Sequence, residues 1–218
     1  MIEIYLFVNP LGPICLETEM ELLKYIEKSS VKIQLHVLPL VNMTTIGDIM
    51  KRRKIAKNDV AARNKLFSDT YSAALDCKTI QLQGRRRARD FLMKLQQAVG
   101  CLKKNYSRKL VEEIVDEIGG DLTMFREDRP SQLVKDLFKA DQTIAHEMGI
   151  VKHPSGVVYN YACDRDYGVL LEGPEALLDL PLLCQTTEES YRIFHLDGYL
   201  KRENERRVVL SSKHLKLV

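Results

Sequence analysis

The chain has 218 residues, of which 45% are hydrophobic and 29% charged, enough for one sizeable core or two small lobes. Its 33 lysines and arginines against 30 acidic residues leave a net charge of +3, too small a surplus to predict binding to nucleic acid or to an anionic membrane. No apolar stretch approaches the roughly 18 residues of a membrane-spanning helix, and Met1 to Val8 is too short and lacks the basic start of a secretory signal. We therefore expect a cytoplasmic protein.

Five cysteines are spread widely along the chain, at Cys15, Cys77, Cys101, Cys163 and Cys184. Their number is odd and no two of them form a Cys-x-x-Cys pair, so the sequence predicts neither a disulfide framework nor a structural zinc site. We expect most of them to be buried thiols that pack as small hydrophobic groups. No other motif indicates a metal or an organic cofactor.

The first 41 residues predict a strand, a helix and a second strand. Ile2–Val8 mixes β-branched and aromatic residues, as a mostly buried strand does. A helix beginning near Cys15 is indicated by apolar residues three or four positions apart, at Leu16, Met20, Leu23 and Ile26. Val31–Val37 alternates apolar and polar residues before Pro39, which predicts a strand with one buried face. Two strands joined by a helix favour a parallel pair with a right-handed crossover.

Residues 42–149 predict helices only. Asp59 can cap one helix that reaches about Leu75, and Ser107 and Ser131 can start two others, over about 107–118 and 131–149. Between them, an apolar stripe marks a further helix at Phe91, Leu92, Leu95, Ala98, Val99 and Leu102. The segment 42–149 is therefore predicted to be an all-helical domain.

Strand character returns after this block. Gly156–Asn160 and Gly168–Leu171, joined by the polar turn Asp164–Asp166, predict a hairpin, and Pro174–Leu183 predicts a short closing helix. The segment Tyr191–Leu200 contains an Asp-Gly turn signal typical of a second hairpin. We predict an α/β chain with a discontinuous core of residues 1–41 and 150–185, a helical insertion at 42–149 and a C-terminal extension at 186–218.

Two motifs resemble the DsbA-like branch of the thioredoxin superfamily. One, at the first strand-to-helix turn where that branch has Cys-x-x-Cys, reads Gly12-Pro13-Ile14-Cys15. The other, Gly149–Asn160, is similar to the branch's second signature, a cis-proline loop that here would contain His153 and Pro154 and lead into the third strand. The resemblance covers roughly residues 1–184 and implies a thioredoxin-like βαβ…ββα core with a large all-helical insertion.

The first motif departs from the family pattern at its first position. In a dithiol oxidoreductase the first cysteine lies exposed at a helix N-terminus, which stabilises its thiolate, and the second cysteine resolves the mixed disulfide. Gly12 has no sulfur, so two-thiol exchange through this motif is excluded. Cys15 then has two interpretations, a small apolar residue or a reactive thiol. His153 has two as well, since it could contact a bound peptide or thiolate or be merely exposed or hydrogen-bonded.

The opening segment Ile2–Leu11 is similar to the start of a DsbA-like subgroup, the cytosolic adaptors that present the stress regulator Spx to the ClpXP protease. This resemblance implies a binding protein whose partners are a client such as an Spx-type regulator and a AAA+ protease. A thiol-disulfide oxidoreductase using Cys15 stays open as an alternative. A kappa-type glutathione transferase ranks below it, because that class generally has a serine near the first-helix turn and this chain has no hydroxyl there.

Two basic runs are candidates for partner binding, Lys51–Lys54 and the series Arg85, Arg86, Arg87 and Arg89. Each can be a solvated helix surface, or its guanidinium groups can pair with carboxylates of a partner. Neither run contains an aromatic residue on which a base could stack, so nucleic acid is not a predicted partner. We expect an acidic protein surface instead.

Overall fold

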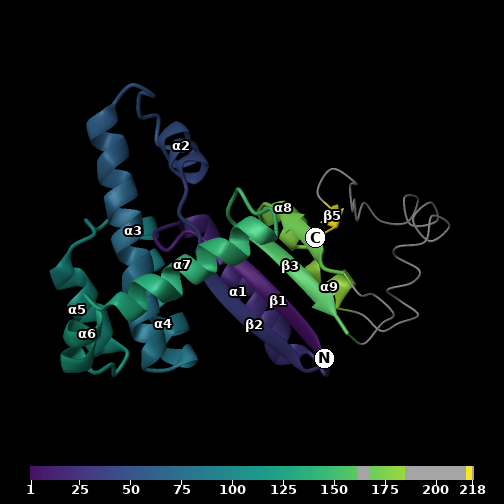
Figure 1. The fold of residues 1–218 in the computed structure, drawn as a ribbon. Coiled ribbons are helices and arrows are strands. Elements are labelled where there is room, and N and C mark those ends of the chain that lie inside the picture. Colours follow the sequence, from purple (N-terminus) through teal and green to yellow (C-terminus); the bar gives the residue numbers. More distant parts are fainter. Residues whose placement is uncertain (162–166, 185–214, 218) are drawn as a thin grey trace.

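The computed structural model describes residues 1–161, 167–184 and 215–217. In these residues the strands form one mixed sheet in the order β2-β1-β3-β4-β5 (Figure 1). The strands are β1 (Ile2–Val8), β2 (Ile33–Pro39), β3 (Ser155–Asn160), β4 (Val169–Glu172) and β5 (Leu215–Leu217). β1 and β2 pair in parallel and the other neighbours pair antiparallel, which confirms the expected opening pair and the β3–β4 pairing. The expected turn at 164–166 and the hairpin at 191–200 lie outside the described residues.

Helices cover both faces of the sheet, and most of them lie between β2 and β3 in the sequence. Figure 1 shows α3 to α6 gathered at one side of the sheet, with α7 running from that group across one sheet face and α1 on the other. The helices are α1 (Pro13–Lys28), α2 (Met43–Arg52), α3 (Val60–Leu82), α4 (Arg85–Leu95), the π-helical turn η1 (Gln96–Cys101), α5 (Arg108–Glu117), α6 (Leu122–Asp128), α7 (Gln132–Glu147), α8 (Pro174–Leu177) and α9 (Leu180–Leu183). The predicted βαβ…ββα order and the helical segment within it are confirmed.

The two faces of the sheet belong to two hydrophobic clusters. One face of β1, with Ile2, Ile4 and Leu6, packs in the cluster that contains α1, α4 and α5. The opposite face, with Phe7, packs with Ala145 from the second half of α7. Each cluster removes apolar surface from water on its own side of the sheet, so β1 is buried on both faces. The division of the chain into domains at residues 41, 149 and 185 stays a prediction.

The predicted helix starts are confirmed, because Asp59, Ser107 and Ser131 each accept a hydrogen bond from a first-turn N–H as N-caps. The helix after Asp59 is longer than predicted and continues to Leu82. Its second half is buried on every side over 73–80, so this part of the helix lacks the one-sided apolar pattern that would have marked it in the sequence.

Two apolar residues that were assigned to buried helix faces are exposed. Met20 is on the outer side of α1, whose buried side carries Cys15 and Leu22 instead. Leu102 follows the π-helical turn η1, whose wider i→i+5 winding rotates later residues away from the stripe of a regular α-helix.

The remaining differences concern short helices. α2 and α6 were not predicted, although Asn42 caps α2 through a capping box with Thr45. The predicted closing helix 174–183 is divided into α8 and α9, with Leu178 exposed between them. Short helices carry too few turns for a clear apolar period, so sequence patterns identify them poorly.

Candidate functional site

The first motif lies at the turn between β1 and α1, and Asn9 holds this turn. The N–H of Leu11 donates to the side-chain Oδ1 of Asn9 at 2.8 Å, and the N–H of Gly12 donates to the Asn9 carbonyl at 3.1 Å. Gly12 is the N-cap of α1 in an extended conformation, and Pro13 is the first helical residue. The backbone therefore does not require glycine at position 12, but an added Cβ would lie 3.1 Å from the Cβ of Asn9.

Cys15 lies in the first turn of α1 and points into the protein. Its side chain is only 1% exposed, and its Sγ accepts a hydrogen bond from the N–H of Asn9 at 3.2 Å. Burial raises the pKa of the Cys15 thiol to about 12, because the charged thiolate loses its hydration there. The group is therefore a neutral thiol at physiological pH, and a neutral thiol is a poor nucleophile.

The loop before β3 brings the second motif to this thiol. The peptide bond between His153 and Pro154 is cis, and the Nδ1 atom of His153 lies 3.7 Å from the Sγ of Cys15. Burial, with a smaller contribution from the positive charge of Arg52, lowers the pKa of His153 to about 4. A neutral imidazole beside a neutral thiol offers no positive charge to stabilise a thiolate. The structure thus joins the two predicted motifs in space without the charge pair of an activated cysteine.

The turn η1 covers the start of α1. A Cβ added at Gly100 would lie 2.9 Å from the backbone nitrogen of Pro13 and 3.0 Å from its Cδ, so the two backbones are in close contact. Gly12 itself is buried. The place where a dithiol oxidoreductase exposes its attacking sulfur is therefore closed by protein. Nothing in the sequence pattern indicated a π-helical turn at this position.

A buried polar cluster beside Cys15 was missed by the sequence analysis. Glu19, one helical turn after Cys15, is 1% exposed, and its Oε1 accepts a hydrogen bond from Nε2 of Gln96 at 2.7 Å. The same Nε2 donates to the Asn9 carbonyl at 3.1 Å. Burial raises the pKa of Glu19 to about 8, although the bond from Gln96 opposes this. The signal that could have identified Glu19 is its spacing of four from Cys15, which places both on one helix face.

On the outer side of His153 there is an open groove of about 690 Å³. Its lining combines cationic and acidic groups from α2, the loop before β3 and the end of β4, namely Asp48, Lys51, Arg52, Lys152, His153, Glu172 and Gly173. Cys15 is not part of this lining. A molecule bound in the groove would therefore touch charged side chains and His153 and leave the thiol covered. We call this the His153 groove.

The predicted arginine candidates do not join this site. Arg85, Arg86, Arg87 and Arg89 lie in the first turns of α4 and do not line the His153 groove. Of the other predicted basic run, Lys51 and Arg52 do line it. Cys77 and Cys184 are buried, and Cys101 is an exposed thiol, whereas Cys163 lies outside the described residues. Within the described residues, no group of three or more His, Cys, Asp or Glu could hold a metal ion.

The family-model comparison decides the family. A model described as Thioredoxin matches residues 5–178. The chain belongs to the thioredoxin family. Solved structures with the same fold include DsbA of Pseudomonas aeruginosa, 16% identical with a TM-score of 0.54 over 83% of this chain and 80% of that one. BdbD of Bacillus subtilis is 11% identical with a TM-score of 0.57 over 83% of each chain. The resemblance to the DsbA-like branch and the fold class are confirmed.

Curated relatives of this thioredoxin-family protein have the name ClpXP adapter protein SpxH. The relative from Bacillus subtilis is 27% identical over 175 residues, which are 73% of this chain and 58% of the relative. That from Staphylococcus saprophyticus is 32% identical over 106 residues, 49% of this chain and 40% of the relative. The matched regions therefore leave a substantial part of each relative without a counterpart in this chain.

Proposed function

We propose that this thioredoxin-family protein is an adaptor that binds a client protein and presents it to a protease of the ClpXP type, without two-thiol chemistry. The observation that carries the proposal is the motif itself, where Gly12 replaces one sulfur and the other, Cys15, is buried with a raised pKa. Binding needs a surface and no thiolate. The name of the curated relatives, ClpXP adapter protein SpxH, supports a AAA+ protease of the ClpXP type as one partner. We propose an Spx-type regulator as the client from the resemblance of the opening segment Ile2–Leu11.

We propose the His153 groove as one contact surface for the client. It lies over the cis-proline loop and presents Lys51, Arg52 and Lys152 beside Asp48 and Glu172. Mixed charge of this kind favours orientation of a protein partner through pairs at the rim. A cytoplasmic location fits this role and stays a prediction; in the described residues, no helix is long and apolar enough to cross a membrane.

The test is a degradation assay with a purified Spx-type regulator, ClpXP and ATP. Adding the protein should accelerate loss of the regulator at least about tenfold, and the charge-reversed variant R52E/K152E should remove most of this acceleration. The variant K28E/K32E, which reverses two exposed lysines that do not line the groove, is the control and should act as the unchanged protein does. No acceleration by the unchanged protein would refute the adaptor function.

One observation favours the alternative of a thiol-disulfide oxidoreductase, the 3.7 Å contact between Cys15 and His153. Such an enzyme requires a thiolate that a substrate can reach, whereas burial raises the pKa of this thiol and encloses it. Reduction of insulin disulfides in the presence of dithiothreitol separates the two functions. We expect a rate equal to that of dithiothreitol alone, and a clear enhancement that Cys15→Ser abolishes would establish the enzyme.

A further inference from the structure

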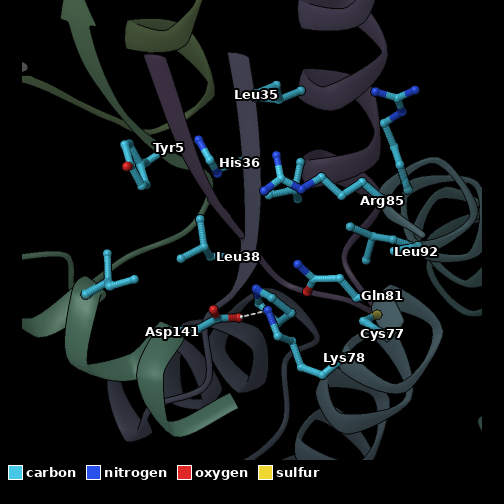
Figure 2. A pocket seen from close by; sticks show the side chains of 15 residues that line it. Tyr5, Leu35, His36, Leu38, Cys77, Lys78, Gln81, Arg85, Leu92 and Asp141 are labelled. Carbon is cyan, nitrogen blue, oxygen red and sulfur yellow. Dashed lines mark ion pairs between the residues drawn. The ribbon is translucent and has the colours of Figure 1, made fainter. Parts of the chain in front are cut away.

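A second cavity, of about 180 Å³, lies around the outer edge of β2 (Figure 2). Five consecutive strand residues, Leu35–Pro39, line it together with side chains from α3, α4 and α7. Because neighbouring residues of a strand point to opposite faces, this lining includes both sides of the strand. The cavity therefore surrounds the edge of the sheet itself. We call it the β2-edge cavity.

The edge of β2 has unpaired backbone groups inside this cavity. The Lys32 carbonyl accepts from the N–H of Ile2, and the N–H of Leu40 donates to the Val8 carbonyl. In a parallel ladder the backbone groups of alternate residues point to the same side, so even-numbered residues of β2 bond to β1. The N–H and C=O groups of Leu35 and Val37 consequently point outward, and no hydrogen bond joins them to another described residue. They form a short free template for one more strand.

The side chain of Gln142, on α7, makes the hydrogen bonds that one residue of such a strand would make. Its Nε2 donates to the Pro39 carbonyl at 2.7 Å, and its Oε1 accepts from the N–H of Val41 at 3.1 Å. These two bonds are the pair that one residue of an added strand makes with an edge. The edge is thus closed by a side chain at Pro39 and left unoccupied at Leu35 and Val37.

The charge around the cavity is positive. Arg85 and Arg89 are four residues apart on α4, and neither forms an ion pair with another described residue. Figure 2 shows the Arg85 side chain extending toward the strand that carries Leu35 and His36. Lys78 is neutralised at the floor by Asp141, at 2.6 Å. The two arginines therefore leave an uncompensated positive charge beside unpaired backbone groups.

We propose that the β2-edge cavity binds an extended, acidic segment of a partner protein, which adds to β2 as a short strand and places a carboxylate against Arg85 and Arg89. Main-chain bonds to Leu35 and Val37 supply affinity in this mode of recognition, and the arginine pair selects the charge. The cavity has room for a side chain and lies outside the His153 groove. It is thus a second binding surface, and its use does not depend on delivery to a protease.

A nucleic acid fits this cavity less well. The cavity is lined by the aromatic ring of Tyr5, which is stacked on His36 with ring centroids 4.7 Å apart and an interplanar angle of 12°. Both rings are therefore engaged with each other, whereas binding of single strands depends on free aromatic faces. Unpaired backbone N–H and C=O groups along an edge match a peptide backbone.

The first test measures binding of a fluorescein-labelled peptide of alternating Asp and Val residues, with the Lys-Val counterpart as the charge control. We expect the acidic peptide to bind and the basic one not to bind. The variant R85E/R89E should weaken binding at least about tenfold, because a like charge then faces the peptide. The matched variant R86E/R87E makes the same change in net charge on residues that do not line the cavity, and should leave affinity within about twofold.

The second test locates the peptide through amide hydrogen exchange followed by NMR. In the free protein the amides of Leu35 and Val37 should exchange faster than those of Gln34, His36 and Leu38, and the acidic peptide should slow them selectively. Equal loss of binding in the two arginine variants, or protection around His153 in place of β2, would overturn the proposal. So would absence of binding by the acidic peptide. Client degradation can persist in each of these cases, so this failure is distinguishable from failure of the adaptor function.

Discussion

The covered thiol at the start of α1 and the open edge of β2 lie on the same sheet and differ in what they can do. Cys15 is enclosed by Asn9, His153 and the turn η1, and its pKa is raised to about 12. The β2 edge instead presents unpaired backbone groups beside two unpaired arginines. The Cys15 site has a sulfur atom, but a substrate cannot reach it and the thiol is neutral. The β2 edge is accessible and positively charged, but it has no reactive atom.

This difference explains how a thioredoxin fold can serve recognition. A reactive thiol needs exposure at a helix N-terminus and a stabilised thiolate, whereas Cys15 is buried and the neighbouring His153 is neutral. The charge of Arg52 favours the Cys15 thiolate but is outweighed by burial. Recognition needs only surfaces that keep their unpaired groups accessible. Three experiments sharpen the comparison by altering the enclosed polar cluster, the floor of the open cavity and the thiol itself.

The largest expected effect is at Glu19, in the closed region. Its pKa is raised by burial from a usual value near 4.5 to about 8, so the stability contributed by the protonated form is fully present below pH 4.5 and lost as pH rises to 8. Between these pH values the free energy of unfolding should fall by about 5 kcal/mol, at ~1.4 kcal/mol for each unit by which the pKa is raised. Glu19→Gln, which keeps a neutral side chain at all pH values, should remove this slope from denaturant unfolding measured between pH 4 and pH 9. Glu17→Gln, at an exposed site on the same helix, should keep it.

The next effect is at the floor of the β2-edge cavity. Lys78 and Asp141 form an ion pair at 2.6 Å with side chains only 5% and 10% exposed. Lys78→Met would leave the Asp141 carboxylate buried and unpaired, so we expect a loss of about 3 to 5 kcal/mol in the free energy of unfolding at pH 7.

The control for Lys78 is on the same helix. Lys65→Met breaks the pair with Asp69, in which the Lys65 side chain is 71% exposed, and should cost less than about 1 kcal/mol. Similar losses of unfolding free energy in the two variants would show that water reaches the Lys78–Asp141 pair at the floor of the cavity.

The third experiment compares two thiols of one chain. At pH 8 only about one Cys15 thiol in 10,000 is ionised if its pKa is about 12, and the side chain is enclosed as well. Iodoacetamide should therefore modify the exposed Cys101 at least about a hundredfold faster than Cys15, as measured by mass spectrometry of the two peptides. Comparable rates would mean that the thiol site opens in solution.

Sequence patterns predicted the opening parallel pair, the later hairpin, three helix starts and the missing sulfur, because strand alternation, N-cap residues and glycine at position 12 are local features. They did not predict the enclosure of Cys15. The enclosure depends on the turn η1, in which Gly100 contacts Pro13 and Gln96 donates a hydrogen bond to the Asn9 carbonyl. Both contacts join residues more than 80 positions apart. The arginine run was also identified, but its division into Arg85 and Arg89 at the cavity and the other two outside it required the position of α4 against β2.

The central claim is that this protein holds its partner without its thiol, and the affinity of an Spx-type regulator tests it most directly. Isothermal titration should give equal dissociation constants, within about twofold, for the unchanged protein and Cys15→Ser, both with and without reductant. A loss of tenfold or more in Cys15→Ser, or a mixed disulfide between Cys15 and the regulator, would contradict the account.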